Sequence, residues 1–144
     1  MGTAIKAPMN PRVLVVDDDA DSGEALGLVF SGGEGSCQVV TSAAAALDVL
    51  ARGAFDVVLC DVRMDGMSGL ELLDRVKKTQ PSLPFVMITG LGGVHDAVDA
   101  MKRGAFEYVV KPCDADVLRT MVVGAIGDRG RAVVDAGSRG RADG

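Results

Sequence analysis

The stretch VLVVDDDAD, residues Val13 to Asp21, sets a short apolar run directly before three consecutive aspartates. An apolar run of this length, bounded by polar residues, is typical of a buried β-strand. Carboxylates at the end of such a strand repel one another and are costly to desolvate. Other residues of the chain must balance them, and we expect those residues at the ends of the other apolar runs.

Four more short runs, rich in β-branched residues, follow along the chain. The predicted strands are Val13–Val16, Gln38–Thr41, Asp56–Cys60, Phe85–Thr89 and Tyr108–Val110. The last three are nearly continuous in apolar residues, as expected for parallel strands covered on both faces. The segments between the runs carry apolar residues three and four positions apart, which is typical of amphipathic helices. This alternation predicts an α/β fold with a parallel sheet, right-handed crossovers and helices on both faces.

Residues suited to capping helices stand at the expected helix starts. Ser42 is placed to cap the second helix and Asp114 the fifth, and Asp19 or Asp21 is placed to cap the first. The length of 144 residues suits a single domain. We expect that domain over residues 12–126, between an N-terminal tail, 1–11, and a glycine- and arginine-rich segment, 127–144, interpreted as a loose tail or a truncated linker.

Charge and hydropathy exclude several classes of protein. The formal net charge of -5 argues against direct nucleic-acid binding, which needs clustered Lys and Arg. No apolar run approaches the roughly 18 residues of a membrane span. The cysteines Cys37, Cys60 and Cys113 show no metal-ligand spacing, so reduced thiols are expected. We therefore expect a cytoplasmic protein that does not bind a membrane.

Reactive side chains stand at the ends of four of the five predicted strands. Asp17 and Asp18 follow the first strand, Asp61 the third and Lys111 the fifth, and Thr89 ends the fourth. Because ligands bind at the carboxyl edge of such a sheet, we expect these groups to act together. Clustered carboxylates suit a hard cation such as Mg²⁺, and a carboxylate can attack phosphorus to form an aspartyl-phosphate. Lys111 and Thr89 are suited to contact the new phosphoryl oxygens.

These motifs resemble the receiver domain of bacterial response regulators, the phosphoacceptor half of two-component signalling, over roughly residues 12–126. VLVVDDD is similar to the first strand of the family with its acidic pair, and DVVLCDVRMDGMSGLELL to its phosphoacceptor strand and the following loop. FVMITG and GAFEYVVKP are similar to its two switch blocks. TGLGGVHDAVDAMKRGAFEYVVKP is most similar to receivers of transcription-activating regulators.

The resemblance implies a flavodoxin-like, doubly wound (βα)5 fold with strand order 2-1-3-4-5. It implies that Asp61 accepts a phosphoryl group from a sensor histidine kinase or a phosphotransfer protein. The cofactor implied is Mg²⁺, held by Asp18, Asp61 and the backbone carbonyl of Arg63, with Asp17 acting largely through water.

The resemblance also assigns the switch. Lys111, before a cis peptide bond to Pro112, is expected to pair with the phosphoryl group. Thr89 is expected to move towards that group, and Tyr108 to rotate into the vacated space. The resemblance thus implies a signalling domain rather than an enzyme, at most with self-phosphorylation from acyl phosphates and self-dephosphorylation.

The switch is expected to repack one surface, formed by the helix around 94–101, the strand 108–110 and the helix around 117–125. In the family this surface binds an output domain or a partner protein, and many members dimerise through it. The implied output is transcriptional. Whether the chain is a fragment of a larger regulator or a stand-alone regulator stays open.

The sequence departs from the family pattern around the site. Asp65 stands where a proline usually follows, four residues after Asp61, and Cys113 stands where phenylalanine is frequent. Arg63 and Leu91 occupy two positions that tune the lifetime of the phosphoryl group. Neither side chain is suited to orient an attacking water, so slow self-dephosphorylation is a hypothesis.

An enzyme alternative is a phosphohydrolase of the haloacid-dehalogenase type, which also has an Asp-x-Asp after a strand. Asp17 would be its nucleophile. Asp21 stands where that motif expects threonine or valine, and the chain lacks length for a cap and a late acidic pair.

Overall fold

The computed structural model describes residues 11–31, 36–90 and 94–127 of the chain. The predictions made for the tails, residues 1–11 and 127–144, and for Leu91 therefore lie almost entirely outside the described residues. None of the helices within these ranges is long and apolar enough to cross a lipid bilayer.

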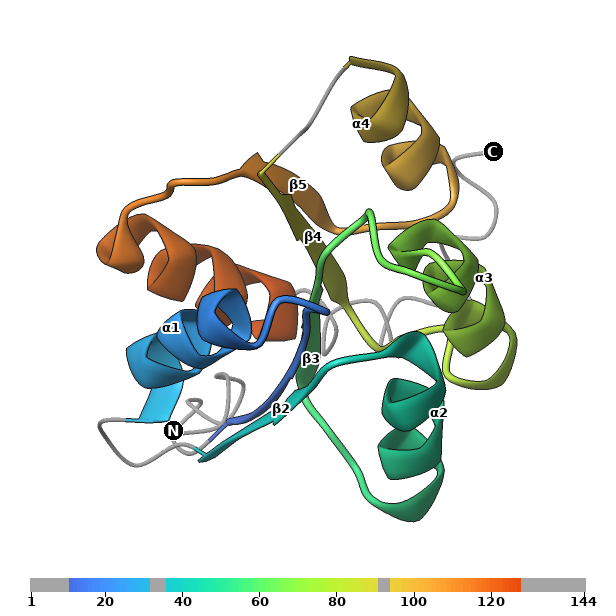
Figure 1. Ribbon diagram of the computed structural model, residues 1–144, viewed down its shortest axis with the longest axis horizontal. Helices are drawn as coiled ribbons and strands as arrows, with labels where there is room; N and C mark the ends of the chain where they lie inside the picture. Colours follow the sequence, from blue (N-terminus) through green and yellow to red (C-terminus); the bar gives the residue numbers. More distant parts are fainter. Residues whose placement is uncertain (1–10, 32–35, 91–93, 128–144) are drawn as a thin grey trace, which may run out of the picture.

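Five parallel strands form one sheet in the order β2-β1-β3-β4-β5 (Figure 1). Their bounds are β1 Arg12–Val16, β2 Ser36–Val40, β3 Val57–Cys60, β4 Phe85–Thr89 and β5 Glu107–Val110. The predicted α/β class, the parallel sheet and the strand order are confirmed. β2 begins at Ser36, two residues earlier than predicted, because Ser36 lies in register with Arg12 and its N–H donates to the Pro11 carbonyl at 3.0 Å.

Five helices alternate with the strands, as predicted. They are α1 Ala20–Ser31, α2 Ala43–Arg52, α3 Gly69–Thr79, α4 Val94–Lys102 and a last helix over residues 115–127, named helix 115–127 below. α1 and helix 115–127 cover one face of the sheet, and α2, α3 and α4 lie on the other (Figure 1).

The core consists of two apolar layers that share the central strands. Along β1, Val13 and Val15 pack towards α1 and helix 115–127, whereas Leu14 and Val16 pack towards α2 and α3. β3 and β4 are buried along their whole length. β5 is not, because it is an edge strand, and Val110 is 50% exposed. Tyr108 and Val109 pack against opposite layers of the core, so this run is covered on both faces as expected, but less completely than the central strands.

The predicted caps place the first helical turns beside the carboxyl ends of the strands. The side chains of Ser42 and Asp114 accept amide hydrogens of their helices, as predicted. At α1 the cap is Asp19 rather than Asp21: Asp19 Oδ1 accepts from the N–H of Asp21 at 3.1 Å and of Ser22 at 3.4 Å. The start of α1 is thereby tied to the run of aspartates that ends β1.

Candidate functional site

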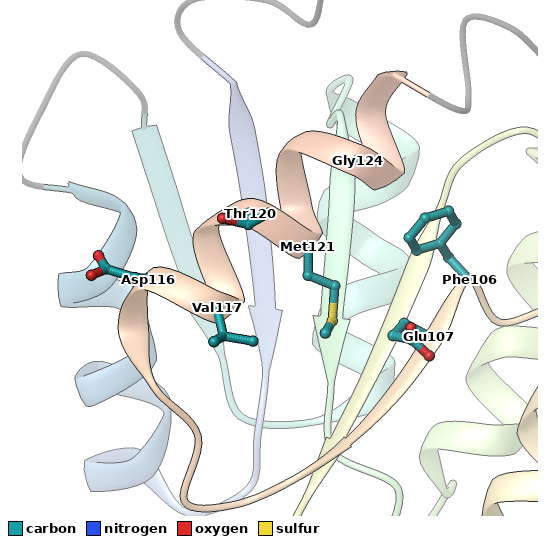
Figure 2. A pocket seen from close by; sticks show the side chains of 7 residues that line it. All are labelled: Phe106, Glu107, Asp116, Val117, Thr120, Met121 and Gly124. Carbon is teal, nitrogen blue, oxygen red and sulfur yellow. The ribbon is translucent and has the colours of Figure 1, made fainter.

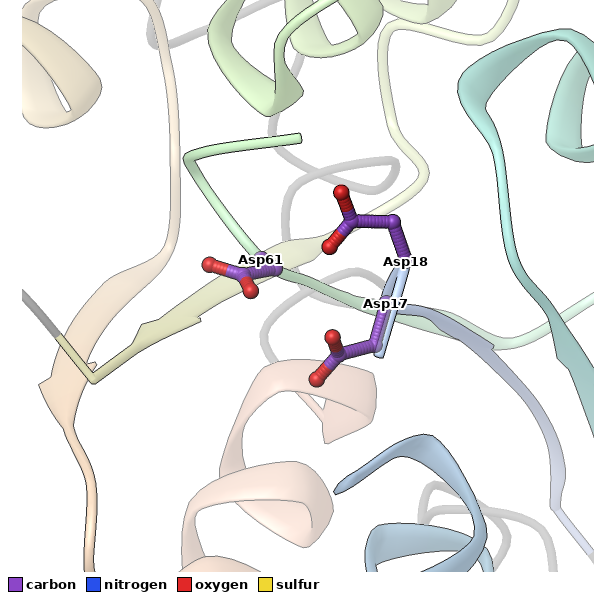
Figure 3. Close-up of side chains that lie close together, drawn as sticks. All are labelled: Asp17, Asp18 and Asp61. Carbon is purple, nitrogen blue, oxygen red and sulfur yellow. The ribbon is translucent and has the colours of Figure 1, made fainter. Parts of the chain in front are cut away.

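Three aspartates meet at the carboxyl edge of the sheet. Asp17 and Asp18 follow β1 and Asp61 follows β3, and one carboxylate oxygen of each lies within 4.8 Å of the others (Figure 3). The neighbouring strands bring them together, because Val16 at the end of β1 lies in register with Cys60 at the end of β3. The predicted convergence of these carboxylates is confirmed.

Asp17 is the most buried of the three, with 1% of its surface exposed. Its Oδ2 accepts a hydrogen bond from Lys111 Nζ at 2.8 Å, and its Oδ1 accepts from the Asp19 N–H at 3.0 Å. A buried carboxylate is stable only when it is paired in this way. Asp17 is therefore a fixed anion inside the site, with both oxygens engaged.

Lys111 extends to the site from the end of β5, although it lies 94 positions from Asp17 along the chain. Its peptide bond to Pro112 is cis, as predicted. The ammonium also donates to Ser22 Oγ, in the first turn of α1, at 2.5 Å. The sequence analysis missed Ser22, because a serine near a helix start is usually a surface or capping residue.

Asp61 is only partly buried, and its carboxylate is less well compensated than that of Asp17. Its Oδ1 accepts from the Arg63 N–H at 3.3 Å. Burial raises the pKa of Asp61 and the charge of Asp17 raises it further, whereas Lys111, the Arg63 N–H and a hydrogen bond with the Thr89 side chain lower it. The net direction is upward, because burial and the charge of Asp17 outweigh the groups that favour the ionised carboxylate.

The loop after β3 is held against the site at two points. The Asp65 N–H donates to Asp18 Oδ2 at 3.1 Å, a bond that a proline at this position would not make. Arg63 extends to α4, where its guanidinium donates to Asp96 Oδ2 at 2.8 Å. Replacement of the usual proline by Asp65 thus adds a contact to one of the clustered carboxylates.

Gly69, at the start of α3, closes this loop and was missed by the sequence analysis. A Cβ atom at Gly69 would lie 2.0 Å from the carbonyl oxygen of Asp61, and the Gly69 N–H donates to the Val62 carbonyl at 2.9 Å. Only a residue without a side chain fits here. The local signal was a serine and a glycine directly before an apolar helical stripe, where Ser68 and Glu71 form a capping box.

Thr89 and Tyr108, the residues predicted to form the switch, lie on the neighbouring strands β4 and β5. Thr89 is 1% exposed and ends β4 beside Asp61. Tyr108 lies in register with Met87, is partly buried against the core layer formed with α2, α3 and α4, and has a buried hydroxyl oxygen.

The donor set of this site fits Mg²⁺. The clustered groups of Asp17, Asp18 and Asp61 are all carboxylate oxygens, which hard divalent cations prefer. The raised pKa of Asp61 points the same way, because its causes are burial and a neighbouring carboxylate, both of which a cation would offset.

An apolar groove of about 490 Å³ lies away from this edge, between β5 and helix 115–127. Its lining residues are Phe106, Glu107, Asp116, Val117, Thr120, Met121 and Gly124 (Figure 2). The side chains of Val117 and Met121 extend from the helix on the side of Phe106 and Glu107, at the start of β5 (Figure 2). The groove contains none of the predicted site residues.

Comparison with known proteins matches the chain to one family. The model of the response regulator receiver domain matches residues 13–123. The response regulator protein FleR of Pseudomonas aeruginosa is 44% identical over 114 residues, covering 79% of this chain and 24% of FleR. The transcriptional regulatory protein ZraR of Escherichia coli is 36% identical over 117 residues, covering 81% of this chain and 26% of ZraR. The chain thus spans about a quarter of the length of these relatives.

Solved receiver structures share the fold over most of the chain. The receiver domain of NtrX from Brucella abortus is 36% identical with a TM-score of 0.73, covering 79% of this chain and 97% of that structure. A response regulator receiver domain protein from Clostridium thermocellum is 29% identical with a TM-score of 0.79, covering 85% of this chain and 98% of that structure.

These matches do not favour the haloacid-dehalogenase alternative. The site does not favour it either, because such an enzyme would use Asp17 as its nucleophile, and Asp17 is buried and paired with Lys111. Phosphorylation and Mg²⁺ are typical of the matched family, whose members interact with histidine kinases and output domains. The strand order, the acidic edge and the match over residues 13–123 agree. The chain belongs to the response regulator receiver domains, the signalling domains of two-component systems.

Proposed function

We propose that Asp61 is the phosphoacceptor of this receiver domain and takes its phosphoryl group from a phosphohistidine of a sensor kinase or a phosphotransfer protein. A carboxylate oxygen of Asp61 attacks phosphorus, so that a P–O bond forms while the P–N bond to histidine breaks, and the imidazole leaves. The observation that carries this proposal is the convergence of Asp17, Asp18 and Asp61 beside the Lys111 ammonium. Asp61 is partly exposed, whereas Asp17 is buried and paired with Lys111.

Mg²⁺ is the cofactor we propose for this step. Asp18, Asp61 and the backbone carbonyl of Arg63 would hold it directly, and Asp17 through water. The bound ion supplies positive charge that offsets the charge developing on the phosphoryl oxygens. The single lysine among three carboxylates supports this assignment, because Lys111 already pairs with Asp17.

Lys111 and Thr89 are the residues that we propose to contact the phosphoryl group. Lys111 supplies an ammonium within the site, and Thr89 already hydrogen-bonds Asp61. A phosphoryl group on Asp61 would compete for the Thr89 hydroxyl and shift it towards the new oxygens. Tyr108, on the neighbouring strand, would then repack against the space that Thr89 leaves.

The surface formed by α4, β5 and helix 115–127 is the proposed output surface, with homodimerisation as one of its uses. Several large apolar side chains are exposed along it: Val98, Met101, Val110, Val117 and Val123. The groove of Figure 2 adds an apolar hollow at its β5 side. Exposed apolar area of this kind is typical of a surface that binds a partner protein.

We propose that the receiver occupies residues 12–126, with residues 127–144 connecting it to an output domain of a transcriptional regulator in the cytoplasm. Support comes from FleR, ZraR and NtrC, relatives of which this chain spans about a quarter. The receiver itself would contact the histidine kinase and the output domain, with no direct role in binding nucleic acid or a membrane. Purifying the full-length gene product and testing promoter binding with and without phosphorylation would decide between this reading and a stand-alone regulator.

Intact mass spectrometry after incubation with acetyl phosphate and Mg²⁺ tests the phosphoacceptor proposal. We expect one added phosphoryl group per chain, which is lost when EDTA replaces Mg²⁺ and lost in Asp61→Asn. Asp74→Asn, which alters a surface carboxylate on α3, is the matched control and should be phosphorylated like the wild type. Phosphorylation of Asp61→Asn to the wild-type extent would contradict the proposal.

The same preparation tests the hypothesis of slow self-dephosphorylation. The Arg63 guanidinium donates a hydrogen bond to Asp96, which directs this side chain towards α4. We expect the phosphoryl group to persist for many minutes after removal of acetyl phosphate in the presence of Mg²⁺. Loss within seconds would contradict the hypothesis without bearing on the identity of the phosphoacceptor.

A further inference from the structure

A closed ring of hydrogen bonds connects the aspartates after β1 with the first turn of α1 and with Lys111. Asp17 Oδ1 accepts from the Asp19 N–H at 3.0 Å, and Asp19 Oδ1 accepts from the Ser22 N–H at 3.4 Å. Ser22 Oγ accepts from Lys111 Nζ at 2.5 Å, and Lys111 Nζ donates to Asp17 Oδ2 at 2.8 Å. Each member of the ring therefore fixes the position of the next.

The two acceptors of the Lys111 ammonium differ in charge. Asp17 is a buried carboxylate, so its bond with Lys111 neutralises charge as well as setting a direction. Ser22 is neutral, so it orients the ammonium while leaving its positive charge in place. An ammonium has three N–H donors. Among the described residues Lys111 directs one to Asp17 and one to Ser22, and the third is left for a group on Asp61.

The ring also assigns a use to the third aspartate of the run. Asp19 is not among the clustered carboxylates, and its side chain caps α1. The Asp19 side chain accepts the backbone N–H of Ser22 and so fixes its position. The backbone N–H of Asp19 in turn donates to Asp17. The side chain of Ser22 is therefore presented to Lys111 by the same carboxylate that pairs with Lys111.

We propose that Ser22 is a positioning residue for phosphorylation: its hydroxyl orients Lys111 so that one N–H of the ammonium is directed at the phosphoryl group on Asp61. The proposal rests on Asp61 as phosphoacceptor and on Lys111 as its cationic partner. It adds α1 to the elements that shape the site. It also gives Lys111, which follows an edge strand and has a side chain that is 24% exposed, a second anchor besides Asp17.

The affinity for beryllofluoride in the presence of Mg²⁺, measured by ¹⁹F NMR titration, tests the proposal, because this ion mimics a phosphoryl group on aspartate. Ser22→Ala should weaken binding roughly 10-fold, the equivalent of one hydrogen bond to a charged group at the low end of its usual range. Ser22→Thr keeps the hydroxyl and should restore binding to about the wild-type value. Thr79→Ala, which removes a hydroxyl at the end of α3, is the matched control and should bind like the wild type.

A double-mutant cycle separates positioning of Lys111 from a general effect on the fold. In a Lys111→Ala background, Ser22→Ala should cause no further loss of beryllofluoride binding, because the group that Ser22 orients is absent. In metal-free protein, the shifts in urea midpoint caused by Ser22→Ala and Lys111→Ala should likewise be non-additive. This second measurement does not depend on Mg²⁺ or on phosphorylation.

The outcomes distinguish this inference from the function on which it rests. If the wild type does not bind beryllofluoride, the phosphoacceptor proposal fails. If the wild type binds and Ser22→Ala binds equally well, the positioning role of Ser22 is wrong and the phosphoacceptor proposal stands. Additive effects of Ser22→Ala and Lys111→Ala, or failure of Ser22→Thr to restore binding, would also overturn the positioning role.

Discussion

Two clusters in this molecule each set a single basic side chain against several carboxylates, one at the edge of the sheet and one on the surface between α3 and α4. On the surface, Arg103 donates to Asp74 on α3 at 2.7 Å and to Asp99 on α4 at 2.8 Å. At the sheet edge, Lys111 pairs with Asp17 while Asp18 and Asp61 lie close by. The two clusters resemble each other in composition, but they differ in their access to water.

Access to water decides whether each cluster needs a further cation to balance its carboxylates. In the surface cluster all three side chains are at least one third exposed, so solvent screens the residual charge. At the sheet edge, Asp17 is buried and the pKa of Asp61 is raised by burial and by Asp17. The surface cluster needs no further cation, because water screens its residual charge. The sheet-edge cluster holds negative charge that water screens less, and an added cation would offset it. That deficit is what equips the sheet edge for Mg²⁺ and phosphoryl chemistry.

The largest expected effect comes from breaking the geometry of the sheet edge at Gly69. Gly69→Ala places a methyl group against the Asp61 carbonyl oxygen, a backbone atom that cannot move aside cheaply, and should lower the free energy of unfolding by about 3 kcal/mol. Gly124→Ala is the control, because its Cβ would meet nothing within 4 Å. Urea denaturation would measure both. A Gly69→Ala variant as stable as the Gly124→Ala variant would show that the loop does not need this close approach.

Removing the cation from each cluster compares them directly. Lys111→Met keeps an apolar stem but leaves the buried Asp17 unpaired, so we expect a loss of about 2 kcal/mol of unfolding free energy. Mg²⁺ should recover part of this loss, because it supplies the missing charge. Urea midpoints with and without Mg²⁺ would measure both effects. Equal losses for Lys111→Met and Arg103→Met would remove the distinction drawn between the clusters.

Asp61→Asn is expected to stabilise the metal-free protein at neutral pH. Because the pKa of Asp61 is raised in the folded state, the protonated carboxyl favours folding, and that contribution is lost as the pH rises above the ordinary pKa of aspartate. Asparagine does not ionise, so it avoids the loss. The gain should be at most about 1 kcal/mol, since water screens a partly exposed group. Urea denaturation in EDTA, at acid and at neutral pH, would measure the unfolding free energies of the wild type and the variant. The variant should be more stable than the wild type only at neutral pH. A variant that is less stable than the wild type at neutral pH would contradict the account.

The smallest effect is expected at the surface cluster. Arg103→Met should lower the unfolding free energy by less than about 1 kcal/mol, and by less still in high salt, because exposed ion pairs are weak and screened. Urea denaturation at two salt concentrations would measure this. A large loss of unfolding free energy that persists in high salt would mean that water does not screen the charges of this cluster.

The sequence predicted the sheet and its acidic edge because both depend on short-range patterns. Apolar runs indicate parallel strands, and such strands bring their carboxyl ends together, so Asp17, Asp18 and Asp61 could be placed side by side. Contacts that depend on side-chain direction could not be predicted. Ser22 lies 89 positions from Lys111, and nothing in its neighbourhood indicates that its hydroxyl faces the lysine.

Two other features depended on three-dimensional placement. The local pattern around Gly69 indicates a helix start, but the need for glycine comes from the close approach of that helix start to the backbone of Asp61. The run at β5 appeared buried from its apolar residues, but its exposure follows from its place at the edge of the sheet. Local patterns thus predicted which elements form, whereas packing decided which residues support the site.

The central claim is that Asp61, rather than Asp17 or Asp18, forms the aspartyl-phosphate. Borohydride reduction of the protein after treatment with acetyl phosphate and Mg²⁺ converts a phosphorylated aspartate to homoserine, and tandem mass spectrometry of the peptides then locates it. We predict homoserine at position 61 and unmodified Asp17 and Asp18. Homoserine at position 17 or 18, with aspartate retained at 61, would contradict the account.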